Sequence, residues 1–102
     1  MQNNKFFRML GLAARARKLN FGEGAVRDSV RTKLAKMVIV AQDASDNTKK
    51  KLSDNCKFYK TPYFEYGDRF TLGGATGKGF AVVISVNDEN FAKTLINILQ
   101  DR

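Results

Sequence analysis

The sequence contains no histidine and no tryptophan, and it has one cysteine and one proline among 102 residues. Without histidine, imidazole general bases and histidine metal sites are excluded, and a single cysteine forms neither an internal disulfide nor a thiolate metal cage. Cys56 follows Leu52 by one helical turn, so we expect it to be a buried structural thiol. We therefore expect no metal and no cofactor.

Long apolar runs are also missing. The longest, from Phe80 to Ile84, is far too short to span a membrane, and Arg8 and Arg15 stand too close around the N-terminal apolar residues for a signal peptide. We expect a cytoplasmic, reduced protein with no membrane partner.

Acidic residues are scarce in the first part of the chain. Residues 1–60 hold 14 basic and 5 acidic side chains, a net +9, whereas residues 61–102 hold 4 and 5, a net −1. Charge needed only for solubility would be spread more evenly, so the asymmetry predicts a basic face and favours nucleic acid as partner. Solvated helix surfaces are the alternative, and we expect one for Lys49-Lys50-Lys51, which winds round a helix.

Helical and strand patterns alternate along the chain. Strands are predicted at Leu19 to Phe21, Met37 to Ala41, Tyr63 to Tyr66 and Phe80 to Val86. A short helix is predicted after Gly67-Asp68, and apolar residues recur at helical spacing in four further segments: Phe6, Phe7, Leu10, Ala13 and Ala14; Val26, Val30 and Leu34; Leu52 and Cys56; Phe91, Leu95, Ile98 and Leu99. Candidate capping residues are Asn3 or Asn4, Asp43 or Ser45, and Asn87 and Asp88.

The run from Met37 to Ala41 is continuous and rich in β-branched residues, which is typical of a strand buried on both faces. Such a strand needs helices on both sides of its sheet. Pro62 precedes the third predicted strand, which favours a position near a sheet edge. No linker or repeat is visible, so residues 1–102 are predicted to form one α/β domain, a three-layer α/β/α sandwich with a mixed four-stranded sheet.

The segment Gly22-Glu23-Gly24 opens the second predicted helix. Free N–H groups at a helix N-terminus bind phosphate or base acceptors, and glycine permits close approach. Arg27 stands where the dinucleotide fingerprint needs its third glycine, so that motif fails, and a plain strand-to-helix turn is the alternative. Arg27 and Arg31, one turn apart on the side of Gly24, favour an RNA-binding helix start.

A glycine-rich segment from Leu72 to Gly79 precedes the last predicted strand. It is not a nucleotide-binding P-loop, because Leu72 replaces the first glycine of that motif and Gly79 replaces its Ser or Thr. The chain must turn tightly there or let something approach its backbone. Phe80 follows this segment; its place at the start of a strand favours the core, and stacking on an unpaired base is the alternative.

Several segments, in this order, resemble one known family. They are Leu10 to Leu19, Gly22-Glu23, Ala35 to Ser45, Asn47 to Leu52, Leu72-Gly73 and Thr76-Gly77-Lys78. The chain resembles the ribosomal protein L7Ae/L30e superfamily, in particular its bacterial YlxQ-type members. The resemblance covers nearly the whole chain. It implies a three-layer α/β/α fold and binding of RNA, typically kink-turns, which are sharply bent helices with tandem G·A pairs and an unstacked nucleotide.

By similarity, the family binds RNA with the loop and start of the second helix and with the loop before the last strand. In this chain these segments are Gly22, Glu23, Gly24, Ala25, Arg27 and Arg31, and Lys78, Gly79 and Phe80. Lys36, Arg15, Arg17 and Lys18 would add phosphate contacts, which position RNA without reading its sequence.

The chain departs from the family at the base-reading positions. Members that bind kink-turns tightly carry an Asn-Glu pair and a later Lys on the second helix, where this chain has Gly24, Ala25 and Asp28. Glu23 would substitute only if the loop took a different path. The resemblance therefore implies weaker guanine readout by side chains, with backbone offered at Gly24.

The expected function is that of a non-enzymatic, monomeric RNA-binding protein whose partner is a structured, ribosomal RNA. The alternative is a protein-interaction module of a ribosome-associated assembly, with ribosomal proteins as partners and only general RNA affinity. An enzyme would need an acid or base placed by a motif, and the sequence supplies none, so we expect no catalysis.

Overall fold

Four short strands form one mixed sheet in the computed structural model, which describes residues 4–101. They are β1 (Leu19–Phe21), β2 (Met37–Val40), β3 (Tyr63–Glu65) and β4 (Val83–Val86), and their order across the sheet is β1-β4-β2-β3. β4 pairs antiparallel with β1 and with β2, whereas β2 and β3 are parallel. β3 is thus an edge strand, as Pro62 predicts.

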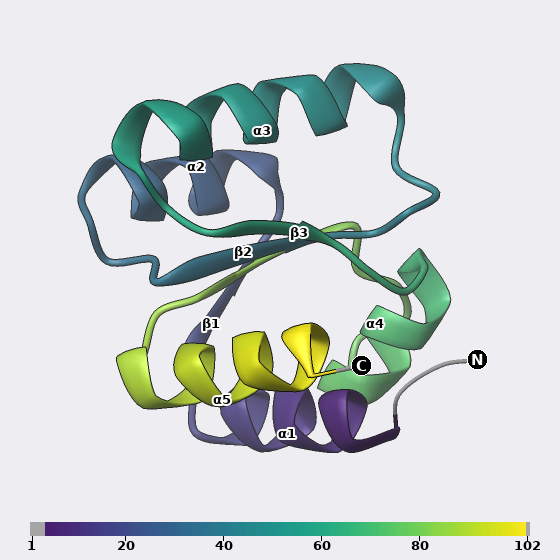
Figure 1. Ribbon diagram of the computed structural model, residues 1–102. Coiled ribbons are helices and arrows are strands. Elements are labelled where there is room, and N and C mark those ends of the chain that lie inside the picture. Colours follow the sequence, from purple (N-terminus) through teal and green to yellow (C-terminus); the bar gives the residue numbers. More distant parts are fainter. Residues whose placement is uncertain (1–3, 102) are drawn as a thin grey trace.

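Helices cover both faces of this sheet (Figure 1). α1 (Asn4–Arg15), α4 (Arg69–Thr76) and α5 (Glu89–Gln100) lie on one face, and α2 (Glu23–Arg31) and α3 (Asp46–Tyr59) lie on the other. The predicted three-layer α/β/α fold is confirmed. Within residues 4–101, no helix combines the length and apolar character that a membrane crossing requires.

Two apolar cores flank the sheet. Phe6, Leu10, Leu72 and Leu95 belong to the core beneath α1, α4 and α5, whereas Val26, Val30, Leu52 and Cys56 belong to the core beneath α2 and α3. Every residue of β2 and of β4 is buried, and along β2 alternate side chains enter opposite cores. The apolar run beginning at Met37 is thereby explained.

The strands predicted to end at Ala41 and Tyr66 end one residue earlier, at Val40 and Glu65. Two other predicted boundaries are wrong by three residues. The last strand begins at Val83 rather than at Phe80, because the preceding residues pack against α4. Leu34 does not continue the apolar face of α2: the helix ends at Arg31, and the Leu34 side chain is 51% exposed.

The helix caps agree with the sequence in most cases. Ser45 caps α3 by accepting a hydrogen bond from the Thr48 N–H at 3.1 Å, and Asp88 caps α5 by accepting from the Phe91 N–H at 2.9 Å. Asp43, the alternative cap of α3, instead binds Arg69. Asn4 is the first residue of α1, and Asn3 lies outside the described residues.

Candidate nucleic-acid interface

β1 leads directly into α2 through Gly22, which has a φ of 90° and a ψ of 151°. A side chain is strained at this φ, so the turn favours glycine. The Gly22 N–H donates to the Val83 carbonyl at 3.1 Å, which fixes the turn to β4. Among residues 4–101, no side chain caps α2. The N–H groups of residues 23–25 therefore have no acceptor within the helix, and they lie at the positive end of the helix dipole. This arrangement suits an anion or a base carbonyl.

The carboxylate of Glu23 contacts α3. Thr48 Oγ1 donates to Glu23 Oε1 at 3.4 Å, and Lys51 Nζ lies 3.4 Å from Glu23 Oε2. Gly24 and Ala25 are exposed, and a Cβ added at Gly24 would meet nothing within 4 Å. Glu23 thus joins the starts of two helices, and the first turn of α2 offers an outside ligand mainly backbone.

Arg27 and Arg31 are exposed and lie one turn apart on α2. Arg31 forms an ion pair with Asp28, and both side chains are more than half exposed. Such a surface pair contributes little stability, so a phosphate can replace the carboxylate at low cost. Arg27 takes part in none of the ion pairs found between described residues. Its guanidinium is available to a phosphate or to a guanine edge.

The loop before β4 is held against α4 by backbone contacts. The Lys78 N–H donates to the Gly73 carbonyl at 2.8 Å, and the Ala81 N–H donates to the Arg69 carbonyl at 2.9 Å. Between these bonds the backbone of Phe80 lies so close to Gly73 that a Cβ there would be 2.8 Å from the Phe80 N and C atoms. The close approach predicted for the glycine-rich segment is thus made by the chain itself.

Phe80 is not a core residue. Its side chain is 62% exposed, because its backbone occupies the space beside α4 and the buried strand starts only at Val83. The core alternative is wrong, and the ring is left free to stack. Lys78 and Gly79 beside it are exposed as well.

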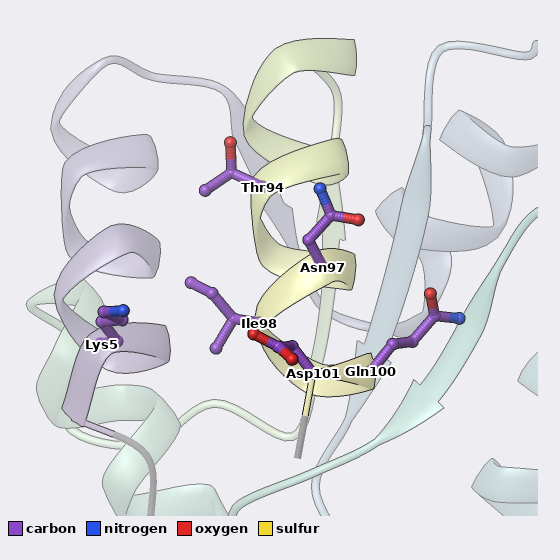
Figure 2. Close-up of a pocket in the computed structure, with 6 residues that line it drawn as sticks. All are labelled: Lys5, Thr94, Asn97, Ile98, Gln100 and Asp101. Atoms are coloured by element: carbon purple, nitrogen blue, oxygen red, sulfur yellow. The ribbon is translucent and has the colours of Figure 1, made fainter.

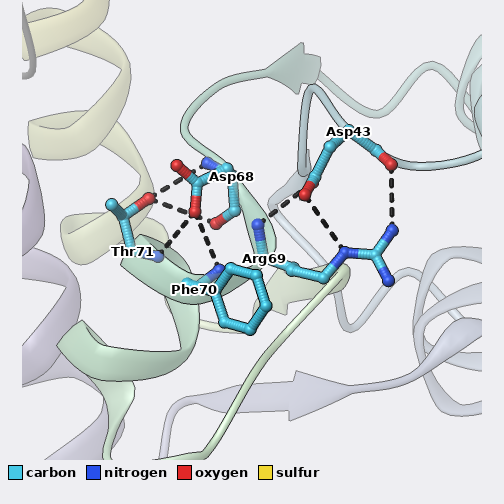
Figure 3. Close-up of polar contacts among 5 residues, drawn as sticks. All are labelled: Asp43, Asp68, Arg69, Phe70 and Thr71. Carbon is cyan, nitrogen blue, oxygen red and sulfur yellow. Dashed lines mark hydrogen bonds and ion pairs between the residues drawn. The ribbon is translucent and has the colours of Figure 1, made fainter.

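Arg69, the first residue of α4, is held by Asp43 of the segment that follows β2 (Figure 3). Asp43 accepts from the Arg69 N–H and from its Nε, both at 3.1 Å, and Arg69 Nη2 donates to the Asp43 carbonyl at 2.9 Å. Asp68 caps α4 by accepting from the N–H groups of Phe70 and Thr71. The start of α4 is therefore fixed on two sides, and the Arg69 carbonyl in turn positions the loop.

The two loops and the start of α3 border a pocket of about 440 Å³. It is lined by Phe21, Gly22, Glu23, Thr48, Phe80, Ala81, Val82 and Val83. Lys78 Nζ lies 4.7 Å from the centre of the Phe21 ring, a cation–π contact that links one loop to the other. The structure thus brings Gly22, Glu23 and Phe80 together at what we call the loop groove.

Five residues that line the loop groove were not predicted to belong to the site: Phe21, Thr48, Ala81, Val82 and Val83. Phe21 stands directly before the Gly22 turn, and its position at the strand end is a signal that would have found it. Thr48 and Val82 reach the groove only through the packing of α3 and β4, for which the local sequence has no signal.

Lys36 lies at the other end of the sheet. Its N–H donates to the Val86 carbonyl at 2.8 Å, whereas the Gly22 N–H donates to the Val83 carbonyl. The length of β4, about 10 Å, separates these two points. Lys18 is at the Lys36 end too, because its carbonyl accepts from the Asn87 N–H at 2.7 Å. Lys36 and Lys18, both expected to contact phosphate, therefore lie away from the loop groove.

A larger pocket of about 600 Å³ lies between α1 and α5 (Figure 2). Its lining comes from one residue of α1 and from the C-terminal part of the chain: Lys5, Thr94, Asn97, Ile98, Gln100 and Asp101. It lies in the other helical layer from α2, and one cation and one carboxylate do not make a binding constellation.

The model of the ribosomal protein L7Ae/L30e/S12e/Gadd45 family matches residues 4–96. The chain belongs to this family. Two relatives, both named RNA-binding protein YlxQ, are similar along almost their whole length. The protein of Bacillus subtilis (strain 168) is 44% identical over 99 residues, which cover 97% of this chain and 99% of the relative. The protein of Enterococcus faecium is 38% identical over 96 residues, which cover 94% and 92%.

Two solved structures share the fold of this chain. A Bacillus halodurans C protein, described as having unknown function, has a TM-score of 0.94 and 42% identity, and the match covers 96% of this chain and 99% of that one. The Giardia lamblia 15.5kD RNA binding protein has a TM-score of 0.81 at 20% identity, covering 99% and 90%. This second likeness shows the fold. The family resemblance seen in the sequence is confirmed.

Proposed function

We propose that this protein is a non-enzymatic RNA-binding protein and that the loop groove is its RNA contact. One observation carries the proposal: an uncapped helix N-terminus and an exposed aromatic ring border the same groove. Backbone donors suit base acceptors, and a free ring suits an unpaired base. The two relatives named RNA-binding proteins support the same function.

The preferred RNA is a structured element of the kink-turn type. The N–H groups of Gly24 and Ala25 would bind acceptors on guanine edges of the tandem G·A pairs, and Phe80 would stack on the unstacked nucleotide. Arg27, Arg31 and Lys78 would bind phosphates around it. The protein would recognise this RNA through its backbone N–H groups and through the shape of the RNA, because the Glu23 carboxylate is already engaged by Lys51 and Thr48.

Contacts outside the groove complete the proposal. Lys36, at the opposite end of β4, would reach a phosphate of a flanking helix rather than the bent element itself. We propose a ribosomal RNA as the target and a monomer as the acting form.

A double substitution tests the RNA-binding surface. Arg27→Ala with Arg31→Ala removes two exposed cations from α2, and Lys5→Ala with Lys93→Ala removes two exposed cations from α1 and α5. Titration of a kink-turn RNA at several salt concentrations should show weaker binding for the first pair, with a log–log salt slope reduced by about 1.5. The second pair should bind within about twofold of the wild type. Equal affinities for the two double variants would remove the assignment of this surface.

A protein-interaction module is the second candidate, and Gly24, Ala25 and Asp28 favour it because none is a base-reading side chain in the family pattern. Affinity for a ribosomal protein that survives both high salt and nuclease would support this candidate. Loss of this affinity after nuclease treatment would leave RNA as the partner.

A further inference from the structure

Phe58 is an exposed aromatic residue far along α3 from the loop groove. Its side chain is 77% exposed, the largest value among the large apolar residues of the described chain. Its ring meets that of Tyr59 edge to face, with centroids 4.8 Å apart and planes at 80°. Tyr59 itself packs against the core beneath α2 and α3. Phe58 therefore presents a supported ring surface to solvent.

Lysines lie close to the Phe58–Tyr59 aromatic pair. Lys57 and Lys60 flank the aromatic pair in sequence, and both are exposed. Lys33 Nζ donates to the Tyr59 carbonyl and lies 5.8 Å from the centre of the Tyr59 ring. Lys36 Nζ, in turn, donates to the Lys33 carbonyl at 3.1 Å. An aromatic pair thus sits among several cations, which we call the α3 end surface.

The charge of the α3 end surface is not neutralised. Lys49, Lys50 and Lys51, earlier on α3, each pair with a carboxylate. Between described residues, no ion pair includes Lys33, Lys36, Lys57 or Lys60. Apart from Arg27, the cations of this helical layer that form no ion pair between described residues therefore lie at the end where Phe58 is exposed.

A seam between α2 and α3 connects this surface with the loop groove. The helices run parallel, because Glu23 contacts Lys51 near their starts and Lys33 contacts Tyr59 near their ends. Arg27 follows Glu23 by one turn, so it continues along the same side of α2. Phe58 follows Lys51 by two turns, so it faces the same side of α3. An RNA strand that leaves the loop groove along this seam passes cations before it reaches the Phe58 ring.

We propose that the α3 end surface is a second RNA contact, where Phe58 stacks on an unpaired base that flanks the element held in the loop groove. Lys33, Lys57 and Lys60 bind the phosphates of that single strand. An aromatic face accepts any base, and unpaired lysines neutralise the backbone, which is the combination found in single-strand binding. Lysine is depleted at protein interfaces, so RNA fits this surface better than a protein partner.

This proposal rests on the proposed function, which supplies the first RNA contact. Two forms of one RNA distinguish the second contact from the first. The first is a kink-turn with blunt ends, and the second carries six unpaired adenosines at each end. The wild type should bind the extended form about tenfold more tightly than the blunt form. Phe58→Ala should bind the two RNAs with equal affinity, and so should Lys57→Ala with Lys60→Ala. Phe58→Tyr, which keeps a ring, should preserve it.

Phe70→Ala is the matched control, because Phe70 is 69% exposed but lies on α4. It should keep the ratio between the two RNAs. Lys78→Ala with Phe80→Ala, both on the loop before β4, should weaken both RNAs and leave the ratio intact, so failure of the first contact is seen separately. A 2-aminopurine placed in the extension should lose fluorescence on binding to the wild type and keep it with Phe58→Ala.

An unchanged ratio in Phe58→Ala, or the same ratio change in Phe70→Ala, would overturn the second contact. If Phe58→Ala kept the ratio but lost a salt-resistant affinity for a ribosomal protein, the surface would belong to a protein partner, and the proposal would again be overturned.

Discussion

Gly73 of α4 packs directly against the backbone of Phe80, with room for no side-chain atom between them. A Cβ at position 73 would lie 2.8 Å from both the N and the C atom of Phe80. Since the backbone of Phe80 occupies this place, its ring stays outside, at the rim of the loop groove. One glycine therefore sets the distance between α4 and the loop that carries the ring.

Gly73→Ala should destabilise the protein by about 1–3 kcal/mol, because the added methyl meets backbone that cannot rotate away. It should also weaken RNA binding, since the loop must move. Gly74→Ala, in the same helix with nothing within 4 Å of its Cβ, should raise stability by about 0.5–1 kcal/mol. Urea unfolding of the two variants measures the contrast, and equal effects would contradict it.

Asp43→Asn should loosen the start of α4, because Asp43 accepts from both the backbone and the side chain of Arg69. The ion pair is partly exposed, so we expect a loss of only about 1 kcal/mol. Lys50→Ala removes the more exposed pair with Asp54 and should change stability by less than about 0.5 kcal/mol. Thermal unfolding compares the two variants. An equal loss of stability in both would mean that the Asp43–Arg69 contacts do not stabilise the start of α4.

Burial raises the pKa of the Cys56 thiol to about 11. The thiol is therefore neutral and enclosed at pH 8, and a thiol reagent should label it only at the rate of unfolding. The unfolded chain gives up this proton at lower pH, so stability should fall as the pH rises from about 9 toward 11. Cys56→Ala should show a shallower fall over that range. Rapid labelling of the folded protein would refute the burial of this thiol.

Two buried serines should respond differently to alanine. Ser29 accepts a hydrogen bond from Asn20 Nδ2 at 2.6 Å, whereas Ser85 Oγ has no partner among the described residues. Ser29→Ala should cost about 1 kcal/mol, and it leaves the Asn20 amide without this acceptor. Ser85→Ala should leave stability unchanged or raise it by about 1 kcal/mol. A loss at Ser85 as large as that at Ser29, measured by urea unfolding, would point to an unseen partner of the Ser85 hydroxyl.

The layers of the fold are predictable from local patterns. The apolar run from Met37 identifies β2, because a strand buried on both faces has no polar alternation. The start of β4 is not predictable in this way, since the apolar run begins at Phe80 while the hydrogen bond of Ala81 goes to Arg69 on α4. A tertiary contact decides that boundary, and it has no local signal.

The candidate site likewise has some features that follow from the local sequence and others that depend on tertiary packing. The Gly22 turn and the exposed Arg27 follow from a glycine pair at a helix start. The engagement of Glu23 by α3 depends on the packing of two helices, and the distance of Lys36 from the loop groove depends on the register of β4. Spacing along the chain cannot supply either fact.

The most direct test of the account is to titrate a kink-turn RNA against the same RNA with its tandem G·A pairs replaced by Watson–Crick pairs, each at two salt concentrations. We predict a preference of at least about tenfold for the intact kink-turn, because backbone donors at Gly24 and Ala25 reach acceptors that only the bent element presents there. The preference should persist at the higher salt concentration. Equal affinities with equally steep salt dependence would contradict the account and would leave only a general polyanion-binding surface.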